Sequence, residues 1–151
     1  ANSQPPLATA YSDHHVRQSA TINSPPQANK GLTVITIYHN FKCGTSRNVL
    51  AEIEAAGIQP TIIRYLDTPL SKDALKQLVR EMAVPVRAIL RERGTPYEEL
   101  DLGNAKWSDD ALLDFVVAHP ILLNRPIVTS PLGAKLCRPV ETVHSLLPTK
   151  G

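Results

Sequence analysis

The sequence predicts an α/β fold with a four-stranded mixed sheet flanked by helices. Three observations predict it. Two short runs rich in β-branched residues, Thr33–Tyr38 and Thr61–Tyr65, are separated by a stretch in which apolar residues recur with helical spacing. Helical patterns without strand signals follow. Two further short apolar runs, Ile127–Thr129 and Ala134–Cys137, then lie close together before a last helical segment.

The first helix connects the first two strands. It is predicted over Ser46–Ala56, with Val49, Leu50 and Ile53 on its apolar face, and Gly57 suits its C-terminal cap. A strand–helix–strand connection of this length predicts that the two strands are parallel, with a right-handed crossover.

Three helices are predicted between the second and third strands. Ser71 is a typical N-cap, and it precedes an apolar face formed by Leu75, Leu78, Val79 and Met82. Pro85 can open a short helix. A polar connection over residues 92–106 leads to Ser108, which caps a helix that ends before Pro120.

The last part of the chain predicts a hairpin and a helix. Pro131 and Gly133 mark a tight turn between the third and fourth strands, and Pro139 can open the final helix. The order β-α-β, helices, β-β-α is the thioredoxin-like layout, with a helical insertion between the second and third strands.

Composition divides the chain into two parts. Residues 1–30 hold four of the 13 prolines, and their apolar residues show no helical or strand period, so we expect a disordered N-terminal extension. Residues 31–151 are long enough for one domain with a core of its own.

Charge and cysteine content exclude several classes of function. The chain has 16 Lys+Arg and 14 Asp+Glu, which gives no reason to expect a nucleic-acid or membrane partner. Neither cysteine lies in a pattern with zinc-site spacing, so we expect no bound metal. A monomer in a reducing cytoplasm is the simplest expectation.

Cys43 is the candidate nucleophile, because it lies where the first strand ends and the first helix begins. Free N–H groups and the helix dipole stabilise a thiolate there and can bind an anion. His39, Lys42 and Arg47 add donors or positive charge nearby, and Gly44 and Thr45 offer close backbone approach and a hydroxyl donor.

Two common cysteine motifs are incomplete. A dithiol motif needs a second cysteine where this chain has Ser46, and a phosphatase loop needs an arginine where it has Val49. A thiol that completes a redox cycle must therefore come from Cys137 or from an external thiol such as glutathione.

Arg125 and Arg138 are predicted to lie on the side of the sheet that carries Cys43. Arg125 precedes Pro126, where thioredoxin-like folds have a cis proline beside the active cysteine. Arg91 ends the short helix after Pro85. Guanidinium groups suit bidentate contacts with tetrahedral oxyanions.

From about Thr33 to Pro148 the chain resembles the glutaredoxin-coupled arsenate reductases. The matching blocks occur in the family's order and spacing: Tyr38-His39-Asn40, Cys43-Gly44-Thr45-Ser46-Arg47-Asn48, Pro60-Thr61-Ile62-Ile63, Val86-Arg87-Ala88-Ile89-Leu90-Arg91, Pro96-Tyr97-Glu98-Glu99-Leu100, Asn124-Arg125-Pro126-Ile127-Val128 and Leu136-Cys137-Arg138-Pro139. The chain departs from the family pattern at Phe41-Lys42, where the family has proline and usually a small residue.

The resemblance implies roles for the site residues. Cys43 is the arsenate nucleophile, His39 activates it indirectly, and the arginines Arg91, Arg125 and Arg138 form the oxyanion site. It also implies glutathione as co-substrate and glutaredoxin as protein partner, with no bound cofactor. Cys137 is then a structural residue.

Two alternatives share the same fold. One is a transcription regulator that binds RNA polymerase, but such relatives carry a Cys-x-x-Cys switch that Ser46 excludes. The other is a reductase-like protein with a different substrate that lacks the full arginine set. Because all three arginines are present, the enzyme is favoured.

Overall fold

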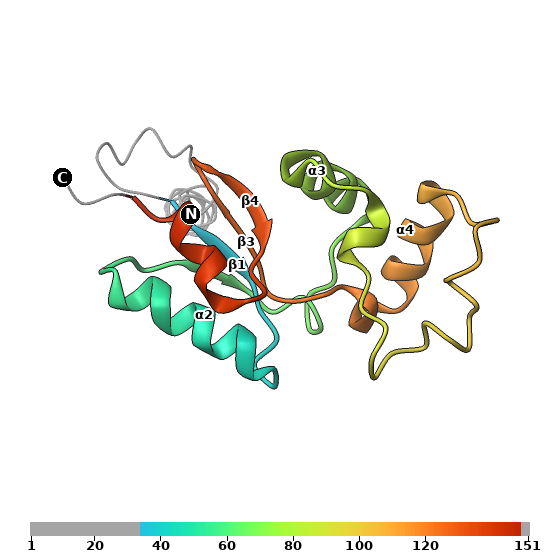
Figure 1. Ribbon diagram of the computed structural model, residues 1–151, viewed down its shortest axis with the longest axis horizontal. Coiled ribbons are helices and arrows are strands. Elements are labelled where there is room, and N and C mark those ends of the chain that lie inside the picture. Colours follow the sequence, from blue (N-terminus) through green and yellow to red (C-terminus); the bar gives the residue numbers. More distant parts are fainter. Residues whose placement is uncertain (1–33, 149–151) are drawn as a thin grey trace, which may run out of the picture. The chain divides into compact units, whose positions relative to one another are not determined.

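The computed structural model describes residues 34–148, so the extension predicted over residues 1–30 lies outside the described residues. The described part forms a sheet with helices on both faces (Figure 1). Its α-helices and strands are β1 (Thr36–Tyr38), α2 (Gly44–Ala55), β2 (Thr61–Ile63), α3 (Lys72–Met82), α4 (Asp109–Ala118), β3 (Ile127–Ser130) and β4 (Gly133–Leu136), and its 3₁₀ helices are η2 (Val86–Ile89), η3 (Pro120–Leu122) and η4 (Val140–Leu146).

The sheet has the order β2-β1-β3-β4. It is four-stranded and mixed, as the sequence predicted. Strand β1 pairs with β2 in parallel and with β3 antiparallel, and β3 pairs with β4 antiparallel. Because β1 is a central strand, the chain that leaves its end is bordered by segments from both sides. This places the cysteine turn in the middle of the sheet edge.

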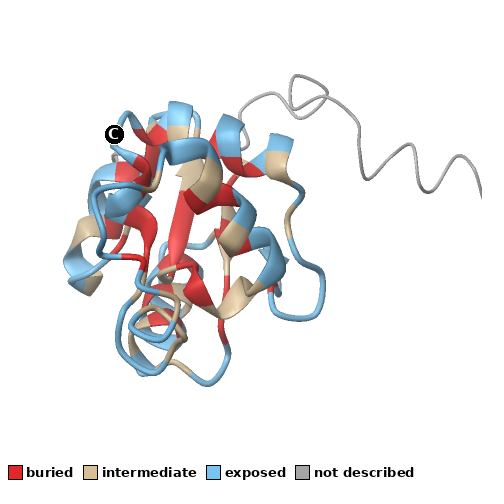
Figure 2. Ribbon diagram, turned by 90° about the vertical axis from the view of Figure 1, so that its right-hand side faces the viewer, coloured by how far each residue is buried: buried red, intermediate tan, exposed pale blue. Residues whose placement is uncertain are grey.

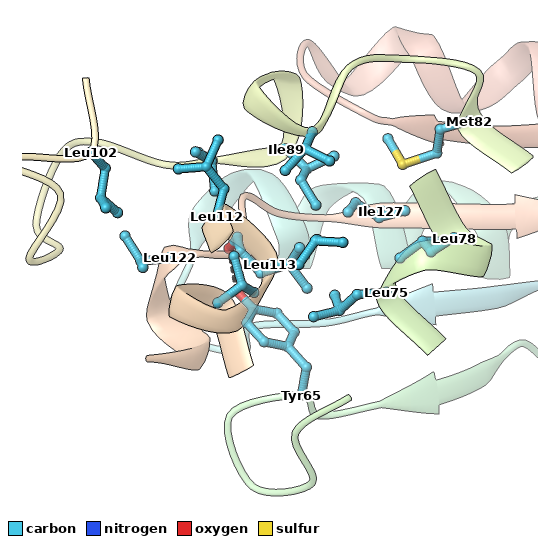
Figure 3. Close-up of a cluster of buried hydrophobic side chains, with 14 of the residues drawn as sticks. Tyr65, Leu75, Leu78, Met82, Ile89, Leu102, Leu112, Leu113, Leu122 and Ile127 are labelled. Carbon is cyan, nitrogen blue, oxygen red and sulfur yellow. Dashed lines mark hydrogen bonds between the residues drawn. The ribbon is translucent and has the colours of Figure 1, made fainter. Parts of the chain in front are cut away.

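Each face of the sheet buries its own apolar cluster. Figure 2 shows the buried residues concentrated in the interior of the described part and the exposed ones at its periphery. Alternate side chains of a strand point to opposite faces, so Val128 packs under α2 and η4 while Ile127 packs under α3 and α4. The first cluster comprises Ile35, Ile37, Val49, Ile53, Val128, Cys137, Val143, Leu146 and Leu147. The larger, second cluster includes Tyr65, Leu75, Leu78, Ile89, Leu112, Leu122 and Ile127 (Figure 3).

The helix signals act as predicted. The Ser71 and Ser108 hydroxyls each accept a hydrogen bond from the backbone N–H three residues on, at 3.1 Å, which caps α3 and α4. No helix within residues 34–148 is long and apolar enough to cross a membrane.

Some predicted boundaries were wrong. Strand β2 ends at Ile63, because the N–H groups of Asp67 and Thr68 donate to the Arg64 carbonyl and turn the chain. Tyr65 therefore lies in that turn, with its ring buried. The final helix forms as the 3₁₀ helix η4.

Candidate functional site

A tight turn carries the chain from β1 into α2. The Cys43 N–H donates to the Asn40 carbonyl at 2.9 Å, and the Lys42 N–H donates to Asn40 Oδ1 at 2.9 Å. Cys43 is the N-cap residue of α2, but its side chain makes no capping hydrogen bond. The thiol is therefore held at the helix start, half-buried and available for chemistry.

Positive charge and a backbone donor act on the Cys43 thiol. Burial, the largest influence, raises its pKa, but the Ser46 N–H and the guanidinium groups of Arg125 and Arg138 together hold the pKa below its ordinary value. Arg138 Nη1 lies 3.7 Å from the Cys43 sulfur. Cys43 thus carries more thiolate at neutral pH than a free cysteine.

The structure brings the three predicted arginines together around this thiol. Arg125 precedes β3 and Arg138 follows β4, and Arg138 Nη1 also donates to the Arg125 carbonyl at 3.0 Å. Arg91 approaches from the segment after η2. Its pKa is lowered first by burial and then by the charges of Arg125 and Arg138, while the Cys43 thiolate opposes that shift.

Arg125 has hydrogen-bonding capacity that the protein does not use. Its Nε and Nη1 atoms are buried and have no partner among the described residues. Nor does any ion pair within residues 34–148 involve Arg91, Arg125 or Arg138. Desolvated donors without a partner are costly. Three clustered guanidinium groups without a carboxylate suit an anionic ligand.

His39 is buried beside the turn. Within residues 34–148, Ser46 is the one side chain that hydrogen-bonds its ring. Its Nδ1 lies 2.6 Å from Ser46 Oγ. Burial, and then the charges of Arg64 and Arg47, lower the pKa of His39 and so favour the neutral ring. Any influence of His39 on the thiol must therefore pass through Ser46 rather than through a positive charge.

Asn40 and Ser46 complete the site, although the sequence pattern indicates a role in it for neither. Ser46 Oγ accepts from the Asn40 N–H at 3.1 Å and is fully buried. Its own N–H faces the thiol. A serine in the first turn of a helix usually caps that helix. The local sequence pattern therefore does not indicate that Ser46 hydrogen-bonds His39 and Asn40 in the preceding turn.

Ser46→Ala is expected to destabilise the protein by about 1–3 kcal/mol, because it leaves the buried His39 Nδ1 and Asn40 N–H without their partner. Urea unfolding measures this loss. Ser145→Ala on the surface is the control. The Ser46 N–H remains in this variant, so the pH midpoint of Cys43 alkylation should change little. Unchanged stability would contradict this account of the turn.

The remaining predicted residues lie at the helix start. Gly44 is exposed, and a Cβ there would meet nothing closer than the Arg47 side chain at 3.8 Å, so the fold itself does not require glycine. Thr45 is half-buried. The exposed Phe41 ring carries the Arg64 guanidinium 4.2 Å from its centroid, and the Lys42 ammonium lies 6.0 Å from it. Lys42 therefore sits over Phe41, while Ser46, Arg125 and Arg138 act on the thiol.

Cys137 lies in the core. It is fully buried beneath η4, its sulfur is 3.7 Å from the Lys135 carbonyl, and burial raises its pKa to about 12. Both cysteines are free thiols. In the described part of the chain, no three His, Cys, Asp or Glu residues gather to hold a metal ion.

Comparison with known proteins identifies the family. The model of the ArsC family matches residues 38–146. The chain belongs to the ArsC family. It is 58% identical to an arsenate reductase of Escherichia coli over 114 residues, covering 76% of this chain and 81% of that protein. It is 52% identical to an arsenate reductase of Rhizobium meliloti, with the same coverage.

The fold of this ArsC-family chain agrees with that of solved relatives. The structure of an arsenate reductase from Vibrio cholerae superposes with a TM-score of 0.75 at 42% identity, covering 78% of this chain and all of that one. The predicted thioredoxin-like fold is thereby confirmed, and the protein is an enzyme of the oxidoreductase class.

Proposed function

We propose that the protein reduces arsenate to arsenite, with glutathione and glutaredoxin as the source of electrons. The observation that carries this proposal is the pairing of an activated thiol with unused cationic donors. Arg138 Nη1 lies 3.7 Å from the Cys43 sulfur, and the buried Nε and Nη1 atoms of neighbouring Arg125 have no partner in the described residues. A tetrahedral dianion would satisfy both groups while it presents its central atom to the thiolate.

The first step joins arsenic to the enzyme. The Cys43 thiolate attacks arsenic and an As–S bond forms, while an arsenate hydroxyl takes up a proton from solvent, its bond to arsenic breaks, and it leaves as water. The guanidinium groups and the N–H groups at the start of α2, including those of Gly44 and Thr45, hold the arsenate oxygens. His39 supports the geometry of the turn through Ser46.

External thiols complete the cycle. Glutathione forms a second As–S bond, and a second water leaves. A glutaredoxin thiolate then attacks the glutathione sulfur and forms a mixed disulfide. The electron pair of the broken As–S bond stays on arsenic, which becomes As(III), and water releases arsenite from Cys43. The thiols supply both electrons, so the cycle requires no bound cofactor.

Two features support an external thiol. Cys137 is buried, and its raised pKa keeps it protonated, so it is poorly suited to attack an adduct on Cys43. The position of a second motif cysteine is occupied by buried Ser46. We therefore place the enzyme in the cytoplasm, where glutathione and glutaredoxin are available, and propose that it works as a monomer.

A coupled assay tests the proposal. Arsenate-dependent oxidation of NADPH is followed in the presence of glutathione, glutaredoxin and glutathione reductase. We expect turnover only when arsenate, glutathione and glutaredoxin are all present. Equal turnover with thioredoxin in place of glutathione and glutaredoxin would refute the proposed coupling but not arsenate reduction.

Arg91→Ala and Arg138→Ala are expected to raise the KM for arsenate by about tenfold or more, because each removes a charged donor. Arg138→Ala should also move the pH midpoint of Cys43 alkylation upward, and by more than Arg91→Ala does, since Arg138 hydrogen-bonds the thiol whereas Arg91 acts on it only through its charge. Arg80→Ala, which removes a guanidinium that bonds Gln77 on the exposed face of α3, is the control. If both variants showed the wild-type dependence of rate on arsenate concentration, these arginines would be surface charges that do not bind arsenate.

A further inference from the structure

The segment that carries Arg125 is fastened to its surroundings at three consecutive residues. The Leu122 carbonyl accepts from the Arg91 N–H at 2.8 Å, and the Asn124 N–H donates to the Ile89 carbonyl at 2.8 Å. These two bonds flank an antiparallel bridge between Leu90 and Leu123. They tie the two arginine-bearing segments to each other, while the pairing of β3 with β1, in which Ile127 lies opposite Tyr38, ties the residues after Arg125 to the strand that leads to Cys43.

Tyr65 adds a connection to the residues just before Arg125. Its hydroxyl donates to the Leu123 carbonyl at 3.1 Å, between the two bonds of the bridge. Tyr65 lies just after β2, and β2 pairs with β1, which leads directly into the Cys43 turn. One side-chain hydrogen bond thus links the residues just before Arg125 to the end of β2, and the β1–β3 pairing holds the residues after it, so Arg125 is anchored on both sides.

The Tyr65 ring is too deeply buried to meet substrate itself. It is 1% exposed and points into the larger apolar cluster (Figure 3). The cavity beside it, lined also by Leu70, Leu75, Val116, Pro120 and Leu123, has a volume of only about 10 Å³. Yet the charge of Arg125, the Asn40 side chain and the charges of Cys43 and Arg91 all act on the phenol. Tyr65 therefore borders the site from behind, without contacting substrate.

We propose that the Tyr65 hydroxyl is a positioning group, which sets the place of Arg125 relative to Cys43 by holding the Leu123 carbonyl. For arsenate as the ligand, this inference rests on the proposed function. Because Leu123 is two residues from Arg125, a shift of the Leu123 carbonyl also shifts the Arg125 guanidinium. The strength with which that guanidinium binds an oxyanion depends on how the two groups are aligned.

Tyr65→Phe tests the proposal, since it keeps the ring and removes only the hydroxyl. We expect the KM for arsenate to rise by about tenfold, with kcat changed by no more than about twofold, in line with the loss of one well-placed binding contact. The pH midpoint of Cys43 alkylation should also move upward, because Arg125 helps to lower the pKa of this thiol. A loss of packing alone would not produce that shift.

Tyr97→Phe is the matched control. Tyr97 packs against the same cluster, but its hydroxyl lies near Gly103. All variants are assayed well below their melting temperatures. A Tyr65→Phe enzyme that melts earlier, yet matches wild type and Tyr97→Phe in KM and in alkylation midpoint, would overturn the inference.

A second readout keeps the two proposals distinct. Arsenate or inorganic phosphate bound at the arginines slows alkylation of Cys43, and the concentration that gives half protection measures anion affinity without turnover. If wild type fails to reduce arsenate, the proposed function falls, but this protection constant still tests Tyr65. Equal protection constants for wild type and Tyr65→Phe would refute the positioning role.

Discussion

Cys43→Ser is expected to lower arsenate turnover by at least about a thousandfold, because a serine hydroxyl is not ionised at neutral pH and cannot replace the thiolate as nucleophile. The fold should survive, since the thiol makes no capping hydrogen bond and serine is a favoured N-cap residue. The melting temperature should be unchanged or slightly higher. The coupled assay and a thermal melt measure the two effects.

Cys137→Ala is the matched control for this substitution. It removes a fully buried sulfur from the cluster beneath η4, so it should lower the free energy of unfolding by about 1 kcal/mol. Arsenate turnover should stay near the wild-type value. The reverse result, with turnover retained in Cys43→Ser and lost in Cys137→Ala, would show that the wrong thiol has been assigned.

Arg125→Ala should have the second-largest effect, with kcat/KM for arsenate reduced by about a hundredfold or more, because it removes charge-assisted donors and also a group that lowers the pKa of Cys43. Its effect on stability should be small. Without an anion, the wild-type protein already bears the cost of two desolvated donors that have no partner in the described residues.

Anion-dependent stabilisation distinguishes this account from a structural role for Arg125. Arsenate or phosphate should raise the melting temperature of wild type, since a ligand that binds only the folded state stabilises it. The same anions should have little effect on Arg125→Ala. Arg125→Lys keeps the charge but loses the planar fork, and should lie between the two. If Arg125→Ala melted at a lower temperature than wild type, yet the anion raised its melting temperature as much as that of wild type, Arg125 would be a structural residue.

The sequence predicted most of the features that depend on local patterns. The order of elements along the chain, the serine caps and the place of Cys43 at a helix start follow from periodicity and capping, which act over a few residues. The convergence of Arg125 and Arg138 on Cys43 followed from topology, because β3 begins and β4 ends at the edge of the sheet where β1 ends. Arg91, in contrast, was placed by resemblance, and the structure brings it near the other two.

The features that sequence reasoning missed depend on where a side chain points. Ser46 pairs with His39 seven residues earlier, and Tyr65 bonds a carbonyl 58 residues later. Neither distance has a periodic signature. The lowered pKa of His39 likewise depends on burial and on Arg64, which directly follows β2. Such details are decided by tertiary packing.

The burial of Cys137 turns the two thiols into separate reporters of one molecule. In the unfolded chain both would titrate near 8.5, whereas folding moves one pKa down and the other up to about 12. A thiol reagent therefore labels Cys43 in the folded state, but reaches Cys137 only during rare openings of the core. In one sample, the fast labelling phase reports the electrostatics of the site and the slow phase reports the free energy of opening. Any variant can then be sorted by which phase it alters.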